Sequence, residues 1–267
     1  PMREVLTTEA CQQLARITAM GPDYRPIGVV VDEKSIVNAI VALLASGGST
    51  NHTMHLVVIA RAAGIKIDWN DMSELSSVIP LLAKIYPDGE ADVNHFHAAG
   101  GTGFLFGELM RGGYLHPDAN TVWGESFIDY CVEPKLKGGN LHWDKTPTKS
   151  VDQSVLSCIE KPFEHEGGIR LLQGNLGRAI IRTSAVERRH QKIEAPALVI
   201  ERQEDLSALF SAGQLDRDCV VVVRYQGPKT LGMPELHKLT SILGVQQDKG
   251  YQVALVTDGR MSGASGK

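Results

Sequence analysis

Apolar residues in the first third of the chain recur at helical spacing. Over residues 34–46 the side chains of Val37, Ile40, Val41 and Leu44 fall on one face, and two glycines follow at positions 47 and 48. This pattern predicts an amphipathic helix that ends at the glycine pair. A second helix is expected to begin with Thr50 or Asn51 as its N-cap and to end at a glycine at position 64.

Two more helices are predicted before the middle of the chain. Asp71 and Glu74 have the spacing of a capping box, which predicts a third helix opening there, with Pro80 breaking or restarting it. Residues 102–111 form the fourth, and the glycine pair at 112–113 ends it. The first part of the chain is therefore expected to be mainly helical.

The pattern changes beyond about residue 124. Residues 124–168 are rich in Pro, Gly, Lys and Trp, which is typical of turns and loops with a short strand or two. Short β-branched runs then recur at 179–182, 197–200, 220–224 and 252–256, with helical stretches at 204–211 and 234–243. We predict an α/β fold with two parts, residues 1–160 and 161–267, the second forming an α/β layer or a β-barrel with helices outside.

Composition excludes several classes of protein. The chain has 27 basic and 31 acidic residues and a net charge of −4, with no basic run longer than residues 188–190, which argues against nucleic acid as a partner. No apolar run approaches the roughly 20 residues of a membrane helix. The four cysteines, Cys11, Cys131, Cys158 and Cys219, form no C-x-x-C pair, so we expect a reducing cytoplasm and neither zinc knuckle nor disulfide framework. Because the chain begins with Pro1, we expect an internal piece of a longer protein.

Two motifs in the first part carry candidate chemistry. SGGSTN, from Ser46 to Asn51, precedes a predicted helix, where hydroxyls and N–H groups could form an anion site, although local grounds favour ordinary N-capping by Thr50 or Asn51. HFHAAGGTGFLFG, from His95, lacks the preceding strand of a dinucleotide fingerprint. The pairs His52/His55 and His95/His97 lack an HExxH signature, so we interpret them as hydrogen-bonding or substrate-binding residues rather than zinc ligands.

Two further motifs lie in the second part. In GPKTLGMPEL, Glu235 follows a glycine-rich loop, where it is either a helix-dipole partner or a ligand for a hard metal ion. TDGRMSGASGK lacks the first glycine of a Walker A motif and is not a nucleophile elbow. As a turn at the end of a strand it presents N–H groups to an anion or oxyanion, or it is a solvated surface turn.

Together the four segments SGGSTN, HFHAAGG, GPKTLGMPEL and TDGRMSGASGK, in this order, resemble the dehydratase family that contains dihydroxy-acid dehydratase and 6-phosphogluconate dehydratase. The resemblance covers essentially the whole chain, and HFHAAGG and GRMSGASGK are most similar to the 6-phosphogluconate branch. It implies the end of a helix-rich α/β N-terminal domain, which binds the cluster, followed by the first part of a swivelling β-barrel domain.

The resemblance also implies a reaction and roles for individual residues. Water would be removed from 6-phospho-D-gluconate to give 2-dehydro-3-deoxy-6-phosphogluconate in the Entner–Doudoroff pathway. Ser262 would be the base and Glu235 a ligand of Mg²⁺. The residues expected to contact the substrate are Ser49, Thr50, Asn51, His97, Lys229, Asp258, Gly259, Arg260 and Ser265.

Family members use an iron–sulfur cluster, of the 4Fe–4S type here, as the Lewis acid, and commonly form homodimers. The family's cluster cysteines belong to segments upstream of Pro1, so the 267-residue chain alone is expected to hold no cluster and to have no dehydratase activity. Two alternatives stay open. One is a dehydratase for dihydroxy-acids or other sugar acids, and the other is a non-catalytic module that binds sugar phosphates.

Overall fold

The computed structural model describes residues 2–232 and 234–261. The chain divides into two compact units. The first contains Pro1–Gly47, His55–Ile85 and Gly89–Gly167, and the second contains Gly48–Met54, Tyr86–Asp88 and Gly168–Lys267. Helices and small sheets together give a mixed α/β structure, as the sequence pattern predicted.

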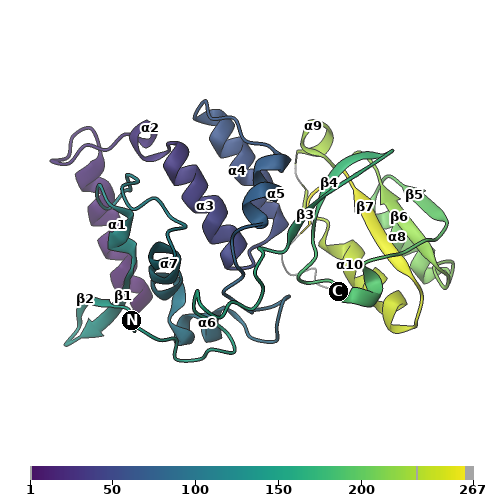
Figure 1. Ribbon diagram of the computed structural model, residues 1–267. Coiled ribbons are helices and arrows are strands. Elements are labelled where there is room, and N and C mark those ends of the chain that lie inside the picture. Colours follow the sequence, from purple (N-terminus) through teal and green to yellow (C-terminus); the bar gives the residue numbers. More distant parts are fainter. Residues whose placement is uncertain (1, 233, 262–267) are drawn as a thin grey trace. The chain divides into compact units, whose positions relative to one another are not determined.

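The first unit is mainly helical, with one two-stranded antiparallel sheet (Figure 1). Its elements are α1 (Met2–Ile17), α2 (Ile27–Val30), α3 (Glu33–Ala45), most of α4 (Thr50–Ala62), α5 (Trp69–Ser76), α6 (Val93–Ala99), α7 (Gly101–Arg111), the 3₁₀ helix η1 (Phe127–Tyr130), β1 (Val132–Lys137) and β2 (Asn140–Lys145). The predicted helices at 34–46 and 102–111 correspond to α3 and α7, and the loop region at 124–168 contains the strands β1 and β2.

The central helix of this unit is α3, whose apolar stripe is buried. Ile40 and Leu44 are at most 1% exposed, as expected for a helix packed against neighbours on one face. Asp32 caps the helix: its carboxylate accepts a hydrogen bond from the amide of Ser35, whose hydroxyl accepts in return from the Asp32 amide. This reciprocal pair satisfies two of the amides that a helix start leaves unpaired.

Two predicted helix starts were wrong by a few residues. The helix α4 includes Thr50 and Asn51, and its cap is Ser49, whose hydroxyl accepts a hydrogen bond from the Asn51 amide at 3.2 Å. The capping box of α5 joins Asp68 to Asp71 rather than Asp71 to Glu74. Adjacent Ser, Thr, Asn and Asp residues can all cap a helix, so the sequence does not distinguish among them.

The second unit is built on a three-stranded parallel sheet in the order β5–β6–β7. Its elements are β3 (Ile169–Gly174), β4 (Gly177–Arg182), the 3₁₀ helix η2 (Arg188–His190), β5 (Ala197–Ile200), α8 (Gln203–Ser211), β6 (Cys219–Val223), α9 (Pro228–Leu231), α10 (His237–Asp248) and β7 (Val253–Thr257). The first two strands form a separate antiparallel hairpin.

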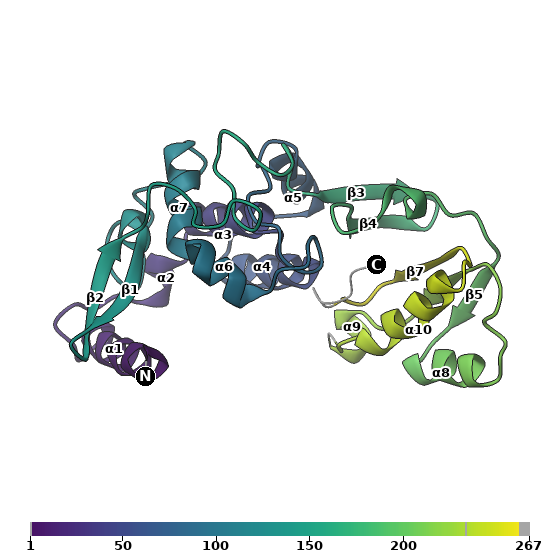
Figure 2. The ribbon, with the colours of Figure 1, turned by 90° about the horizontal axis from the view of Figure 1, so that it is seen from below.

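Burial along β6 alternates in the way a sheet covered mainly on one face requires. Cys219, Val221 and Val223 are buried, whereas the two residues between them are only half-buried. The buried side chains form a core with Leu206 of α8 and Leu239 of α10. Both helices connect neighbouring parallel strands, and such crossovers are right-handed, so they cover the same face of the sheet (Figure 2).

The predicted helix at 234–243 begins later than expected. Its start is His237 in α10, and Pro234 therefore does not occupy the first helical position. The later start has a structural cause, because Glu235, two residues before the helix, forms a parallel β-bridge with Arg260. The proline at the first helical turn is Pro228 in α9. Within the part of the chain that the structure describes, no helix has both the length and the apolar character needed to cross a bilayer.

Candidate functional site

The carboxyl ends of β6 and β7 lie at the same edge of the parallel sheet, since the two strands pair in parallel register. Ligands of open α/β sheets bind outside this edge. The loop after β6 contains Gln226 and Gly227 and leads into α9, and the turn after β7 contains Asp258, Gly259 and Arg260. Two of the motifs singled out from the sequence therefore meet at one place in the second unit.

Asp258 ties these two loops together. Its carboxylate accepts hydrogen bonds from the amides of Gln226, at 2.9 Å, and Gly227, at 3.2 Å. Gln226 is itself buried, and its side-chain amide donates to the carbonyl of Glu201. Tyr225, just before it, adopts a left-handed backbone conformation with φ of 62°. A non-glycine residue in this region carries strain that its surroundings must offset.

Gly259 has no room for a side chain. A Cβ atom there would lie 2.7 Å from Cδ1 of Leu236 and 2.8 Å from Cβ of Gln226. The two loops therefore approach each other more closely than any other residue at position 259 would allow. On either side of this glycine, Asp258 accepts a hydrogen bond from the Gln226 amide and Arg260 pairs with Glu235.

Glu235 and Arg260 form the charged part of the site. Oε2 of Glu235 lies 3.3 Å from Nη1 of Arg260, and the two side chains are 35% and 19% exposed. The other oxygen of the carboxylate, Oε1, is buried and has no hydrogen-bond donor among the described residues. A buried carboxylate oxygen without a donor is unfavourable. Such an oxygen is chemically suited to a hydroxyl donor or to a hard metal ion such as Mg²⁺, to which Glu235 would contribute one ligand.

The first turn of α4 reaches the same charged group. Nη1 of Arg260 lies 2.6 Å from Oδ1 of Asn51. Asn51 and the capping residue Ser49 belong to the second unit together with Glu235 and Arg260. The structure thus brings Asn51, from the SGGSTN segment, to the two other motifs.

One ion pair near this segment had no signal in the sequence. Arg182, at the end of β4, pairs with Asp88, and the two side chains are only 8% and 3% exposed. Arg182 also donates from Nη1 to the carbonyl of Gly48 at 3.1 Å and from Nε to the hydroxyl of Ser184. Burial lowers the pKa of Arg182 to about 10, while the adjacent carboxylate favours its charged form. The pair anchors the backbone just before Ser49.

The remaining predicted site residues are placed as follows. His97 is exposed on α6, in the first unit, and Lys229 is exposed on α9, in the second. His95 and His97 are two apart in a helix and do not share a face. Hydrogen bonds from His95 and Asn94 hold the pKa of Asp92 at about 2. Ser262 and Ser265 lie outside the described residues.

The described residues include one group of three side chains with metal-ligand chemistry, Glu108, Cys158 and Glu160 in the first unit. Arg111 already contacts both carboxylates, and its hydrogen bonds hold the pKa of Glu160 at about 2. A cation therefore already neutralises this group. A single thiol also does not match an iron–sulfur cluster, which is held by several thiolates.

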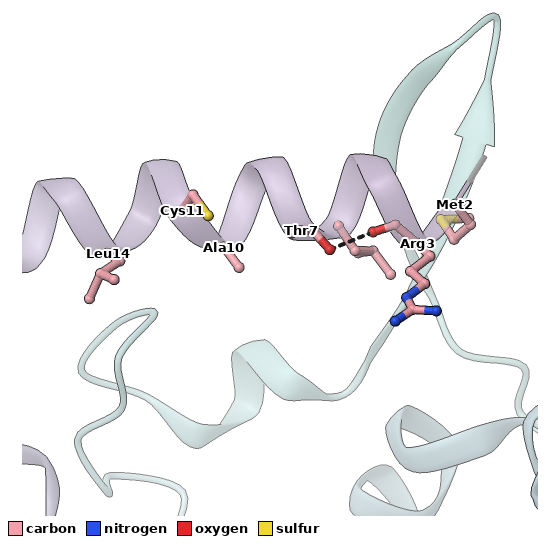
Figure 3. A pocket seen from close by; sticks show the side chains of 7 residues that line it. Met2, Arg3, Thr7, Ala10, Cys11 and Leu14 are labelled. Carbon is pink, nitrogen blue, oxygen red and sulfur yellow. Dashed lines mark hydrogen bonds between the residues drawn. The ribbon is translucent and has the colours of Figure 1, made fainter.

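The face of α1 carries an open apolar depression, shown in Figure 3. It is lined by Met2, Arg3, Leu6, Thr7, Ala10, Cys11 and Leu14. No residue of this helix is buried. The only hydrogen bond drawn there runs within the helix, from the Thr7 hydroxyl to the carbonyl of Arg3. A surface with so few polar groups is unsuited to a charged sugar acid.

Comparison with known proteins identifies the family. Residues 1–130 match the description "Dihydroxy-acid/6-phosphogluconate dehydratase N-terminal", and residues 154–267 match the corresponding C-terminal description. The chain belongs to the dihydroxy-acid/6-phosphogluconate dehydratase family. The family resemblance expected from the four motifs is confirmed.

Individual members of the dehydratase family differ in their similarity to this chain. Phosphogluconate dehydratases of Pseudomonas aeruginosa and Escherichia coli K12 are each 57% identical over 267 residues, which is 100% of this chain and 44% of each relative. The dihydroxy-acid dehydratase of Caldanaerobacter subterraneus is 35% identical over 240 residues, covering 88% of this chain and 40% of the relative. The chain thus spans less than half the length of these relatives.

Proposed function

We propose that the longer protein to which this chain corresponds dehydrates 6-phospho-D-gluconate to 2-dehydro-3-deoxy-6-phosphogluconate, a step of the Entner–Doudoroff pathway. The observation that carries the proposal is the 57% identity along the whole chain to relatives named phosphogluconate dehydratase, against 35% to a dihydroxy-acid dehydratase. Glu235 supports it, because this residue pairs with Arg260 in the turn after β7, at the edge of the sheet where ligands bind, and has a buried acceptor oxygen without a donor among the described residues.

The reaction requires three things of the site. A base must take the weakly acidic proton from C2, the hydroxyl group on C3 must leave, and negative charge on the carboxylate must be stabilised. Glu235 supplies an oxygen that would hold Mg²⁺, and this ion, when bound, would neutralise charge that develops on the substrate carboxylate. Arg260 keeps Oε2 of Glu235 engaged, so Oε1 is the oxygen left without a donor among the described residues.

Ser262 is our candidate for the base, two positions after Arg260 in the sequence. A serine hydroxyl is too weakly acidic to act alone, and it needs nearby positive charge or N–H donors to form an alkoxide. We infer that the 4Fe–4S cluster of the family belongs to parts of the protein beyond this chain, since its described thiols do not form a ligand set. No step above depends on that cluster. A homodimer and a cytoplasmic location remain predictions from the resemblance.

The test is turnover by the full-length protein with 6-phosphogluconate and, in parallel, with 2,3-dihydroxy-isovalerate. We expect a clear preference for the phosphorylated substrate, and preference for the other acid would refute the assignment. The Ser262→Ala variant should lose turnover and still bind 6-phosphogluconate, whereas Ser241→Ala, on α10, serves as the matched control. Binding without turnover in the wild-type protein would favour the sugar-phosphate-binding module instead.

A further inference from the structure

Arg260 contacts two other residues of the candidate site with one guanidinium nitrogen. Nη1 lies 2.6 Å from Oδ1 of Asn51 and 3.3 Å from Oε2 of Glu235. Asn51 is 209 positions away in the sequence. With the Arg260 side chain only 19% exposed, solvent weakens these contacts less than it would at an open surface.

The backbone reinforces the contact between side chains. Glu235 and Arg260 also form a parallel β-bridge, and the carbonyl of Glu235 accepts a hydrogen bond from the side-chain amide of Gln203 at 3.2 Å. The Glu235 carboxylate is thus fixed both through its own backbone and through the guanidinium. An arginine suits this task, because its planar, permanently charged group holds several acceptors in fixed directions.

The charge balance argues against direct recognition of a phosphate group by Arg260. Its positive charge is already matched by Glu235 at ion-pair distance, which weakens its attraction for a second anion. The same contact leaves Oε1 of Glu235 as the oxygen without a donor among the described residues. Arg260 therefore engages one oxygen of Glu235 and leaves the other free of a donor among the described residues.

We propose that Arg260 is a positioning residue, which acts through Glu235 and Asn51 instead of binding the substrate itself. This inference rests on the proposed function and deepens it. Arg260 holds the first turn of α4 and the segment before α10 at a fixed separation. A displacement of about 1 Å in a positioned group is enough to lower turnover by about 100-fold.

A double-mutant cycle in the full-length protein tests the proposal. The proteins are wild type, Arg260→Gln, Glu235→Gln and the double variant, with Arg260→Lys as the conservative replacement. The matched control is Arg217→Gln, an exposed arginine just before β6, at the opposite end of the sheet. Both kcat and KM are measured with 6-phosphogluconate.

If Arg260 acts through Glu235, Arg260→Gln lowers kcat by roughly 10- to 100-fold, the range expected for one charge-assisted hydrogen bond, and KM changes little. The double variant is then within about two-fold of Glu235→Gln alone, because residues acting as a unit are not additive. Arg260→Lys recovers part of the loss, and Arg217→Gln has wild-type kinetics.

Independent effects that multiply in the double variant would overturn the proposal, as would a raised KM with unchanged kcat in Arg260→Gln. If the wild-type protein fails to turn over 6-phosphogluconate, the proposed function fails. In that case the contact is judged from the unfolding free energies of the same four proteins. Coupling between Arg260 and Glu235 supports the contact, and additivity rejects it.

Discussion

Replacing Arg182 with methionine is expected to destabilise the second unit, because it leaves the carboxylate of Asp88 buried without its positively charged partner. Asp88 is 3% exposed and pairs with Arg182, which is 8% exposed. Removing one partner of a buried ion pair costs about 3–5 kcal/mol, because the other charge stays buried without compensation. The cost of protonating Asp88 instead is of similar size. At pH 7, which is about three units above the ordinary pKa of an aspartate, protonating the carboxylate requires a free energy of about 4 kcal/mol.

The destabilisation in Arg182→Met should depend on pH with a definite sign. A buried carboxyl group without a partner favours the protonated form in the folded state, so the variant loses stability as pH rises from about 4 to 7. At pH 5 the protonation cost falls to roughly 1.5 kcal/mol. We therefore expect the difference between variant and wild type to shrink by about 2–3 kcal/mol between pH 7 and pH 5.

Native-state hydrogen exchange of the amides in β3 and β4 measures this difference locally, after correction for the intrinsic pH dependence of exchange. The control is the double variant Arg182→Met, Asp88→Leu, which buries no charge and should recover most of the stability. An equal loss at both pH values would refute the reasoning. A double variant as unstable as the single one would show that Arg182 contributes through packing instead.

Two further predictions concern the packing of each unit. Gly103→Ala should lower the free energy of unfolding by about 1–3 kcal/mol, because a Cβ there would lie 2.3 Å from a carbonyl oxygen of β1. The control is Gly107→Ala in the same helix, where a Cβ would have no atom nearer than 3.8 Å, and it should be neutral or stabilising. A lower melting temperature for Gly107→Ala than for Gly103→Ala would contradict this prediction. Asp258→Ala removes the acceptor of two backbone amides and should destabilise this loop by about 1–3 kcal/mol. Hydrogen exchange of those two amides should become faster in the variant. Unchanged exchange would show that the carboxylate does not stabilise the loop.

The local elements of the fold were predictable because their signals are local. Three of the four residues in the apolar stripe that predicts a helix at 34–46, Ile40, Val41 and Leu44, are buried in α3, and the β-branched run at 197–200 coincides with β5 (Ala197–Ile200). The errors in the predicted helices lie at their starts, as for Ser49 and Asp68, where neighbouring residues compete for the same capping role. Which residue caps the helix depends on the direction in which the backbone enters it. The pattern of apolar and polar residues carries no information about that direction. The pattern did not predict α6 or β3.

Contacts between distant segments were not predictable from one sequence. Arg182 donates to a carbonyl 134 positions away, and Arg260 donates to Asn51 across 209 positions. An arginine at the end of a β-branched run is ordinary in a solvated strand, and nothing in its neighbours indicates burial beside Asp88. The motif residues could be named from the resemblance, but the partner that each of them contacts depends on the fold.

Glu235 illustrates how structure decides between two readings of one residue. The sequence allows an acidic side chain that merely favours the helix dipole in a first turn, or one that binds a ligand. The first explanation requires Glu235 to lie within the helix, yet α10 begins at His237 and has no acidic residue in its first turn. What remains is a carboxylate with one oxygen on Arg260 and the other buried without a donor among the described residues. Since such an oxygen is costly in a folded protein, its retention favours the ligand-binding role.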